Sequence, residues 1–279
     1  MPRVPNFLHL GPGKSGSTWL HETLIHHPDV WLSEAKDLYY FSRYPDRGRD
    51  WYLGHFAAAG DQPVVGEVCP DYLAAPDAAR LVRDDLGPDV RLMVSLRDPV
   101  DRAFSSFLYA TKHGLAAPTL RAEVERDPRL VEEGRYGTQL RRFAAQFPLE
   151  QVHVAVFDDL EADPRGYLDS VTDWLDLPSQ DVTPEMLEAT LPASKARFVP
   201  LARATKAAAD WVRARDGAAM IGRVKRSPWV QQTLYRPLGV DRPRIDPADE
   251  TWLREVFDKE IALVEDDFGI ALRERWGWR

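Results

Sequence analysis

The sequence predicts an α/β protein with a central, mainly parallel sheet flanked by helices and a helical C-terminal extension. Four short apolar runs read as strands: residues 7–10, 64–67, 90–96 and 152–156. Each crossover between two runs is long enough for a βαβ unit, which makes the two strands parallel. Past about residue 181 the strand pattern fades, and no Pro/Gly/Ser-rich linker divides the chain. We therefore expect one domain over residues 1–279, with the extension at about 200–279.

Helices are expected between the strands and near the C-terminus. Apolar residues at helical spacing, or boundary residues, mark four segments: residues 17–26, 75–86, 138–147 and about 247–268. Pro99 is expected in the first turn of a further helix after the third strand. Asp246 and Pro247 supply an N-cap and a first turn for the last helix.

The composition excludes several classes of protein. The 279 residues carry a formal net charge of −8, which argues against a nucleic-acid-binding protein. No run of about 18 apolar residues predicts a membrane span, and no signal peptide precedes the first strand. Cys69 is the only cysteine, so a reducing, cytoplasmic location is expected. The seven histidines show no metal-ligand spacing with Cys69, so no metal is expected.

A glycine-rich segment follows the first strand. Residues 11–18 read Gly-Pro-Gly-Lys-Ser-Gly-Ser-Thr, and their backbone N–H groups and the following helix N-terminus favour an anion. Lys14 adds a full positive charge. Three hydroxyl groups add donors: Ser15, Ser17 and Thr18. The alternative is an ordinary glycine-rich turn. The segment is not a Walker loop, because Leu8 stands where that pattern needs its first glycine.

A second candidate anion site follows the third strand. Arg97 emerges at the carboxyl end of that strand, the edge at which parallel sheets bind ligands. Ser105 lies about two turns along the next helix. Arg97 and Ser105 can therefore share one phosphate, with the guanidinium as a bidentate fork. The alternative is that Arg97 pairs with Asp98 or Asp101.

These segments resemble motifs of the sulfotransferases that use 3′-phosphoadenosine 5′-phosphosulfate (PAPS). Residues 14–19, Lys-Ser-Gly-Ser-Thr-Trp, are similar to the family's 5′-phosphosulfate loop. Residues 95–105, Ser-Leu-Arg-Asp-Pro-Val-Asp-Arg-Ala-Phe-Ser, are similar to its 3′-phosphate motif. Four more segments are similar to the glycan and heparan-sulfate branch of the family: residues 36–41, 66–73, 134–140 and 194–200. The sequence departs from that branch at Val68, where a lysine is common, and at Ala196, which replaces a glycine.

The resemblance implies an enzyme, a bacterial cytosolic relative of that branch with a P-loop-like fold. It would transfer a sulfuryl group from PAPS to a hydroxyl or amine of a small-molecule, sugar or natural-product acceptor, leaving PAP without using a metal. Glu67 would be the general base, and Lys14 would stabilise charge on the leaving oxygen. The nucleotide-binding residues would be Lys14, Ser15, Gly16, Ser17, Thr18, Trp19, Arg97, Ser105, Lys195 and Arg197. The acceptor would contact Lys36, Tyr72 and Tyr136.

Other interpretations stay open at this point. Trp19 could pack in the core instead of stacking on adenine, and Glu67 could pair with an arginine. A P-loop small-molecule kinase would need Mg²⁺ and a true Walker loop. A nucleotide-binding protein without catalysis is a third interpretation. The sequence identifies neither the acceptor nor the oligomeric state, although the basic and aromatic segment 203–236 is a candidate to cap the acceptor.

Overall fold

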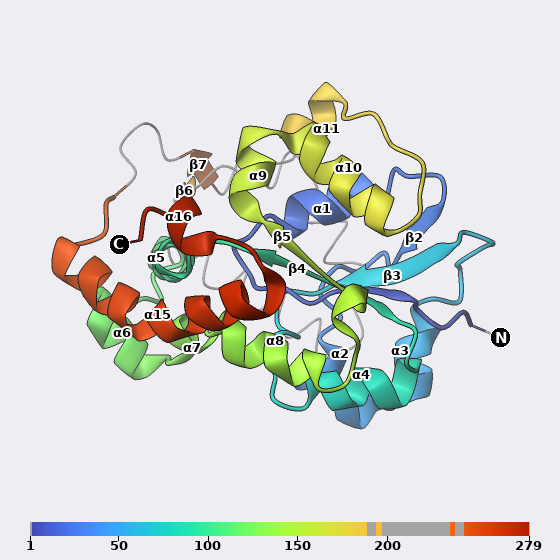
Figure 1. The fold of residues 1–279 in the computed structure, drawn as a ribbon, viewed down its shortest axis with the longest axis horizontal. Coiled ribbons are helices and arrows are strands. Elements are labelled where there is room, and N and C mark those ends of the chain that lie inside the picture. The colour runs from blue at the N-terminus through green and yellow to red at the C-terminus, as the bar shows by residue number, and fades with distance from the viewer. Residues whose placement is uncertain (1, 189–193, 197–234, 238–242, 279) are drawn as a thin grey trace.

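A computed structural model describes residues 2–188, 194–196, 235–237 and 243–278. Its main sheet has five strands, all parallel, in the order β2-β3-β1-β4-β5 (Figure 1). The strands are β1 (Phe7–His9), β2 (Val30–Leu32), β3 (Val64–Val68), β4 (Arg91–Leu96) and β5 (Val152–Val156). The four predicted strands are confirmed, and the three-residue strand β2 at the sheet edge was not predicted.

Helices cover both faces of the sheet, with α1 and α10 on one side and α4 and α8 on the other (Figure 1). The helices in the first half of the chain are α1 (Ser17–Leu24), α2 (Tyr40–Arg43), α3 (Arg49–Gly54), α4 (Ala78–Leu86), α5 (Pro99–Lys112), α6 (Leu120–Arg126) and α7 (Arg129–Glu132). Those in the second half are α8 (Tyr136–Ala144), α9 (Phe157–Ala162), α10 (Pro164–Trp174), α11 (Pro184–Glu188), α15 (Pro247–Phe268) and α16 (Leu272–Arg275). Two short 3₁₀ turns lie at Pro45–Arg47 and Leu149–Gln151.

The alternation of side chains along the central strand β1 divides the core into two layers. Leu8 belongs to the cluster that contains Leu92 and the aromatic side chains around α2 and α3. Phe7 belongs to the opposite cluster, with Met93 and the residues of α1 and α10. Successive residues of a strand point to opposite faces of a sheet. Because Leu8 pairs with Glu67 in the parallel register, the Glu67 side chain lies on the first of these faces.

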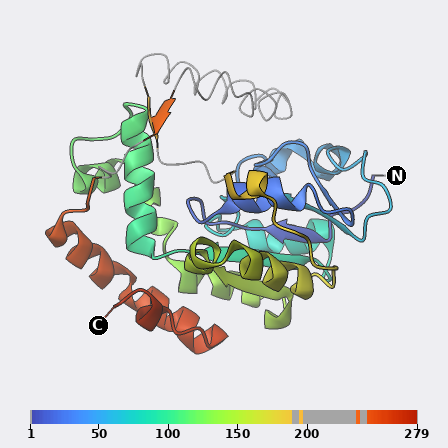
Figure 2. The ribbon, with the colours of Figure 1, turned by 90° about the horizontal axis from the view of Figure 1, so that it is seen from above.

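The C-terminal helix α15 is part of the domain and packs along α8 and α5 (Figures 1 and 2). A Cβ added to Gly137 of α8 would lie 2.4 Å from Cβ of Leu263, so only glycine allows this close approach. The Glu260 carboxylate of α15 accepts hydrogen bonds from the backbone N–H and the hydroxyl of Thr138, at 2.8 and 2.9 Å. The predicted helix at 247–268 and its Asp246 cap are confirmed, since Asp246 Oδ1 accepts from Ala248 N at 2.8 Å.

A two-stranded antiparallel ribbon, β6 (Ser194–Ala196) and β7 (Tyr235–Pro237), lies near one end of α5 (Figure 2). The sequence did not predict this ribbon. The expectation that segment 203–236 caps the acceptor falls mostly on residues outside those that the structure describes. No helix in the described part of the chain is long and apolar enough to cross a membrane.

Candidate active site

The glycine-rich loop between β1 and α1 is held in a tight turn by its backbone. Gly16 precedes the first residue of α1 and has φ of +83°, a left-handed conformation. A Cβ at this position would lie 2.6 Å from Cδ2 of Leu160 in α9 and 3.2 Å from the Phe157 ring. Glycine is therefore required both for its backbone angle and for its contact with α9. The turn leads directly into the N-terminus of α1, which has no side-chain cap, and such helix ends favour the binding of an anion.

Ser15 has the environment expected of a residue that binds an anion. Its side chain is fully buried, yet among the described residues its Oγ has no hydrogen-bond partner. A buried hydroxyl without a partner costs about 1–3 kcal/mol, so such groups usually have a role. A phosphate or sulfate oxygen at the N-terminus of α1 would accept this hydrogen bond.

Arg97 joins the two predicted anion motifs. Its Nη1 donates a hydrogen bond to the Lys14 carbonyl at 3.1 Å, so the end of β4 is tied directly to the loop. The guanidinium carbon lies 4.8 Å from the centre of the Phe157 ring, and Nη2 is 3.9 Å from a carboxylate oxygen of Asp101. The alternative pairing with Asp101 is thus present but long. Asp98 instead caps α5, where its Oδ1 accepts from Val100 N at 2.8 Å.

One face of helix α5 lies toward the loop. Lys14 Nζ lies 3.6 Å from the ring centre of Tyr109. Ser105 is four residues before Tyr109 and therefore shares its face of the helix. The structure thus brings Lys14, Arg97 and Ser105 to one region at the carboxyl edge of the sheet.

Glu67 lies in the interior below this edge and is held by three donors. Its side chain is fully buried. Oε1 accepts hydrogen bonds from Leu38 N and the Tyr72 hydroxyl, both at 2.9 Å, and Oε2 accepts from the Tyr52 hydroxyl at 3.0 Å. Burial raises the pKa of Glu67 to about 7, although these three hydrogen bonds favour the charged form. The group is therefore half-ionised near neutral pH, and among the described residues it forms no ion pair with an arginine.

Comparisons with known proteins identify the family of this chain. Residues 39–181 match the model of the "Sulfotransferase family". The chain belongs to the sulfotransferase family. It is 31% identical over 183 residues to mouse "Heparan sulfate glucosamine 3-O-sulfotransferase 6", covering 63% of this chain and 53% of that protein. It is 28% identical over 199 residues to the Caenorhabditis briggsae "Bifunctional heparan sulfate N-deacetylase/N-sulfotransferase 1", covering 63% of this chain and 23% of that protein.

A solved sulfotransferase from Alicyclobacillus acidocaldarius shares the fold. The two chains superpose with a TM-score of 0.59 and 25% identity, over 67% of this chain and 89% of that one. By contrast, the match spans about half of the mouse enzyme and less than a quarter of the nematode enzyme. The family and the fold are thereby shown.

Two residues expected to contact the acceptor lie in the interior and support other site residues. The Tyr72 hydroxyl donates to Glu67 and accepts from Tyr40 N at 3.0 Å. The Tyr136 hydroxyl donates to the Arg97 carbonyl at 2.9 Å and so fixes the backbone from which that guanidinium projects. Lys36, the third expected acceptor contact, is mostly buried and pairs with Asp37 Oδ1 at 2.7 Å.

Three expected nucleotide contacts have different outcomes. Trp19 is only 2% exposed and packs edge to face against Tyr167, with ring centres 5.9 Å apart. This is the core position that the sequence left open, and it leaves no ring face exposed to an adenine. Lys195 lies in β6, where its backbone is opposite Arg236. Arg197 lies outside the residues that the structure describes.

A series of buried, hydrogen-bonded side chains lies on the other face of the sheet, directly under the loop, and was not predicted from the sequence. His9 Nδ1 accepts from Gly11 N at 3.3 Å, and His9 Nε2 is 3.0 Å from the Ser95 hydroxyl. The Ser95 hydroxyl is in turn 2.7 Å from that of Tyr167. Burial, and secondly the positive charge of Lys36, lowers the pKa of His9 to about 3, so the ring is neutral. The only local signal was a histidine inside an apolar strand, immediately before the loop.

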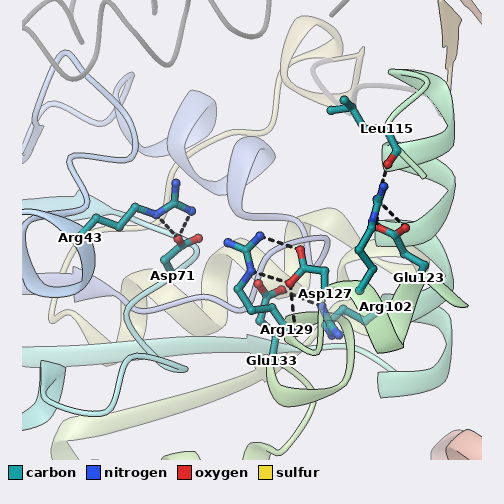
Figure 3. A network of polar contacts seen from close by, with 9 residues as sticks. Arg43, Asp71, Arg102, Leu115, Glu123, Asp127, Arg129 and Glu133 are labelled. Carbon is teal, nitrogen blue, oxygen red and sulfur yellow. Dashed lines mark hydrogen bonds and ion pairs between the residues drawn. The ribbon is translucent and has the colours of Figure 1, made fainter. Parts of the chain in front are cut away.

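Figure 3 shows a group of arginine–carboxylate pairs that includes residues of α5 and α7. Asp71, four residues after Glu67, accepts from Arg43 Nε at 2.8 Å, and Arg129 pairs with Asp127 at 2.6 Å. Arg102 of α5, fully buried, pairs with Glu133 at 2.9 Å. Among the described residues, no three His, Cys, Asp or Glu side chains are grouped so as to hold a metal ion.

Proposed function

We propose that this chain is a PAPS-dependent sulfotransferase that moves the sulfuryl group of PAPS to a hydroxyl or amine. The observation that carries the proposal is the direct hydrogen bond from Arg97 to the Lys14 carbonyl. It joins two anion-binding elements, the loop with the unpartnered Ser15 hydroxyl and the strand end with the guanidinium. A nucleotide with phosphate groups at both its 3′ and 5′ ends matches two such elements, whereas the triphosphate of ATP needs a single extended loop.

Separate groups of residues act on the leaving nucleotide and on the acceptor. Ser15 and the backbone N–H groups at the start of α1 bind the 5′-phosphate, and Ser17 and Thr18 add hydroxyl donors. Lys14 stabilises the negative charge that develops on the bridging oxygen as PAP leaves, which lowers the barrier without a metal ion. Arg97 and Ser105 bind the 3′-phosphate.

Glu67 accepts the proton of the acceptor. A base with a pKa near 7 is matched to a reaction at neutral pH. Because both carboxylate oxygens are buried, an acceptor group reaches Glu67 only when the Tyr52 or Tyr72 hydroxyl gives up its hydrogen bond. We propose that this exchange occurs as the acceptor enters, and that the protein then contacts the acceptor with Lys36.

The acceptor is proposed as a class only. By their names, one relative sulfates an oxygen of a heparan sulfate glucosamine and another is an N-sulfotransferase. We therefore propose a sugar or small-molecule acceptor that offers a hydroxyl or amine, in a cytoplasmic protein of secondary metabolism.

Ligand-dependent melting tests the proposal. PAP should raise the melting temperature in a concentration-dependent way, and an excess of EDTA should leave that rise unchanged. ATP with Mg²⁺ should produce no comparable rise. Stabilisation by ATP and Mg²⁺ but not by PAP would instead support a P-loop kinase. Binding of PAP without any release of PAP from PAPS across hydroxyl and amine acceptors would indicate a nucleotide-binding protein without catalysis.

A further inference from the structure

We call residues 275–278 the C-terminal brace. This segment contacts two parts of the chain beside Arg97: Asp98, which follows it, and the start of α9. Trp278 Nε1 donates a hydrogen bond to Asp98 Oδ2 at 2.9 Å, across 180 residues of sequence. Trp276 Nε1 donates to Asp158 Oδ2 at 3.2 Å. Both indoles are only 8% exposed, so these are interior contacts.

The first contact acts on the residue next to Arg97. One oxygen of Asp98 caps helix α5, and the other accepts the Trp278 N–H. Asp98 is largely buried, and this burial raises its pKa, while the Trp278 hydrogen bond opposes the rise. Without the indole N–H, a buried carboxylate oxygen would lose its hydrogen bond, and such a loss drives a side chain to turn or take up a proton. The backbone between β4 and α5, from which Arg97 projects, would then shift.

The second contact acts on the ring beneath Arg97. Asp158 follows Phe157, whose ring lies under the guanidinium and would be 3.2 Å from a Cβ added at Gly16 of the loop. Arg275 adds an ion pair to the next residue, Asp159, at 2.6 Å. The brace therefore fixes the start of α9 at the point where it meets both anion-binding elements.

The brace is itself anchored on α15. Arg254 lies with its guanidinium carbon 5.4 Å from the Trp278 ring centre, and its Nη1 donates to the Gly277 carbonyl at 3.3 Å. The contacts run from α15 through the two indoles to Asp98 and Asp158, and through the backbone from these to the neighbouring Arg97 and Phe157.

We propose that Trp278 and Trp276 are positioning residues of the anion site at Arg97, and that their indole N–H groups set its affinity for a 3′-phosphate. This inference rests on the proposed function. No residue of the brace is proposed to contact the ligand. The two tryptophans act only through Asp98 and Asp158, on the backbone of Arg97 and on the ring below it.

The test compares two nucleotides that differ at the 3′ position. PAP carries the 3′-phosphate, and adenosine 5′-phosphosulfate lacks it. Because adenosine 5′-phosphosulfate also carries a 5′ sulfuryl group that PAP does not have, the ratio of the two affinities is compared between each variant and the wild type. Trp278→Phe and Trp276→Phe keep an aromatic ring in each position and remove only the donor. The matched control is Trp252→Phe, on α15, whose ring lies 4.7 Å from Arg121 and away from Arg97. Calorimetry on the full-length chain measures both dissociation constants.

We expect each brace variant to weaken PAP binding by about 3- to 30-fold. Binding of adenosine 5′-phosphosulfate should change by less than about 2-fold, as should both affinities in the control. A merely structural role would lower the melting temperature but leave the ratio of the two affinities unchanged in the folded protein.

The inference would be overturned if the ratio of the two dissociation constants stayed as in the wild type, whether neither affinity changed or both fell by the same factor. The proposed function would remain intact. If the wild-type chain did not bind PAP, the proposed function would fail first, so the two failures are distinguishable. Should Trp278→Phe fail to fold, Trp276→Phe retains the Asp98 contact and decides the question through the same ratio.

Discussion

At the scale of single residues, Glu67 shows how burial and hydrogen bonding compete. Desolvation disfavours the carboxylate, while Leu38 N, Tyr52 and Tyr72 stabilise it, and desolvation is the larger effect. The result is a carboxyl group with a pKa of about 7 at the carboxyl edge of a parallel sheet. Shifted carboxyl groups of this kind are common among catalytic bases.

Replacement of Glu67 by Gln tests its role as base. Glu67→Gln keeps the size of the side chain but cannot take up the acceptor proton. We expect turnover to fall by about 10²- to 10⁴-fold while the affinity for PAP is kept. In the wild type, turnover should rise as pH increases through about 7, because Glu67 then becomes ionised.

The matched control for that variant is Asp71→Asn, which removes a nearby carboxylate that pairs with Arg43. It should retain the pH profile of the wild type. A Glu67→Gln enzyme with near wild-type turnover at every pH would assign the base to another residue.

Arg97 gives a second test at this scale. Arg97→Ala removes the guanidinium from a mostly buried site and should weaken PAP binding by about 2–5 kcal/mol. Adenosine 5′-phosphosulfate should lose little affinity, because it has no 3′-phosphate for Arg97 to bind. Calorimetry with both nucleotides makes the measurement. Equal losses would mean that Arg97 acts mainly through its hydrogen bond to the Lys14 carbonyl.

The site residues that the sequence predicted lie in short local motifs. Ser15 and Arg97 each lie beside a strand end or a helix start that is visible as a pattern, and Ser105 lies about two turns along the helix that follows Arg97. Their neighbourhood at one sheet edge therefore followed from parallel topology. The partners that complete the site come from afar and leave no local pattern. Tyr52 reaches Glu67 from α3, and Trp278 reaches Asp98 across 180 residues.

At the scale of elements, the strands with apolar cores and the helices with caps were predictable. β3 is buried throughout and β4 in all but its first residue, and β5, like these two, is an apolar run in the sequence. Pro99 and Pro247 mark the starts of α5 and α15. β2 was missed because it is three residues long and lies at the sheet edge. Trp19 lay on a predicted helix, but the packing of Tyr167 from α10 against it had no signal in the sequence.

Arg102 links α5 to α7 and predicts a strong effect on stability. Its side chain is fully buried, pairs with Glu133 and donates to the Leu130 carbonyl. Arg102→Ala should lower the free energy of unfolding by about 3–5 kcal/mol, because it removes a fully buried side chain and leaves a partly buried carboxylate without its partner. Urea unfolding measures the change.

The matched control is Arg80→Ala on α4, where the arginine is exposed and pairs with Asp84 at 3.1 Å. This change should cost less than about 1 kcal/mol. Adding Glu133→Gln to Arg102→Ala should recover part of the loss, because the unpaired charge is then removed. If the double variant were no more stable than Arg102→Ala, the buried charge would not be the cause.

At the scale of the whole molecule, the fold class followed from the alternation of strands and helices, and the acceptor did not. Acceptor specificity depends on how distant segments meet, and most of the expected cap, 203–236, lies outside the described residues. The parallel register does, however, place two buried titratable groups on opposite faces of one sheet. Glu67 lies on the α2 and α3 side, and His9 lies on the α10 side.

These two groups make opposite contributions to the pH dependence of folding. Folding raises the pKa of Glu67 from 4.5 to about 7, so its contribution to stability is full below about 4.5 and is lost as pH rises through about 7. Folding lowers the pKa of His9 from 6.5 to about 3, so its contribution is present above about 6.5 and is lost as pH falls through about 3. Between pH 4.5 and 6.5 the folded state holds one more proton at Glu67 and the unfolded state one more at His9. The two slopes therefore cancel in the wild type.

Single variants should expose each slope. In Glu67→Gln only the His9 contribution remains, so stability relative to wild type should rise by up to about 1.4 kcal/mol for each pH unit between about pH 5 and 6.5. In His9→Gln, whose amide can still reach Ser95, only the Glu67 contribution remains, and relative stability should fall with pH at a similar rate. Urea unfolding of the three proteins at several pH values gives both slopes, and the other titrating groups cancel in the differences from wild type. Lys36 and Asp37, which act on the charge of His9, are unchanged in all three proteins. Difference curves that stay level with pH would show that neither group changes its proton affinity on folding, and curves of equal sign would contradict the opposite directions of the two pKa shifts.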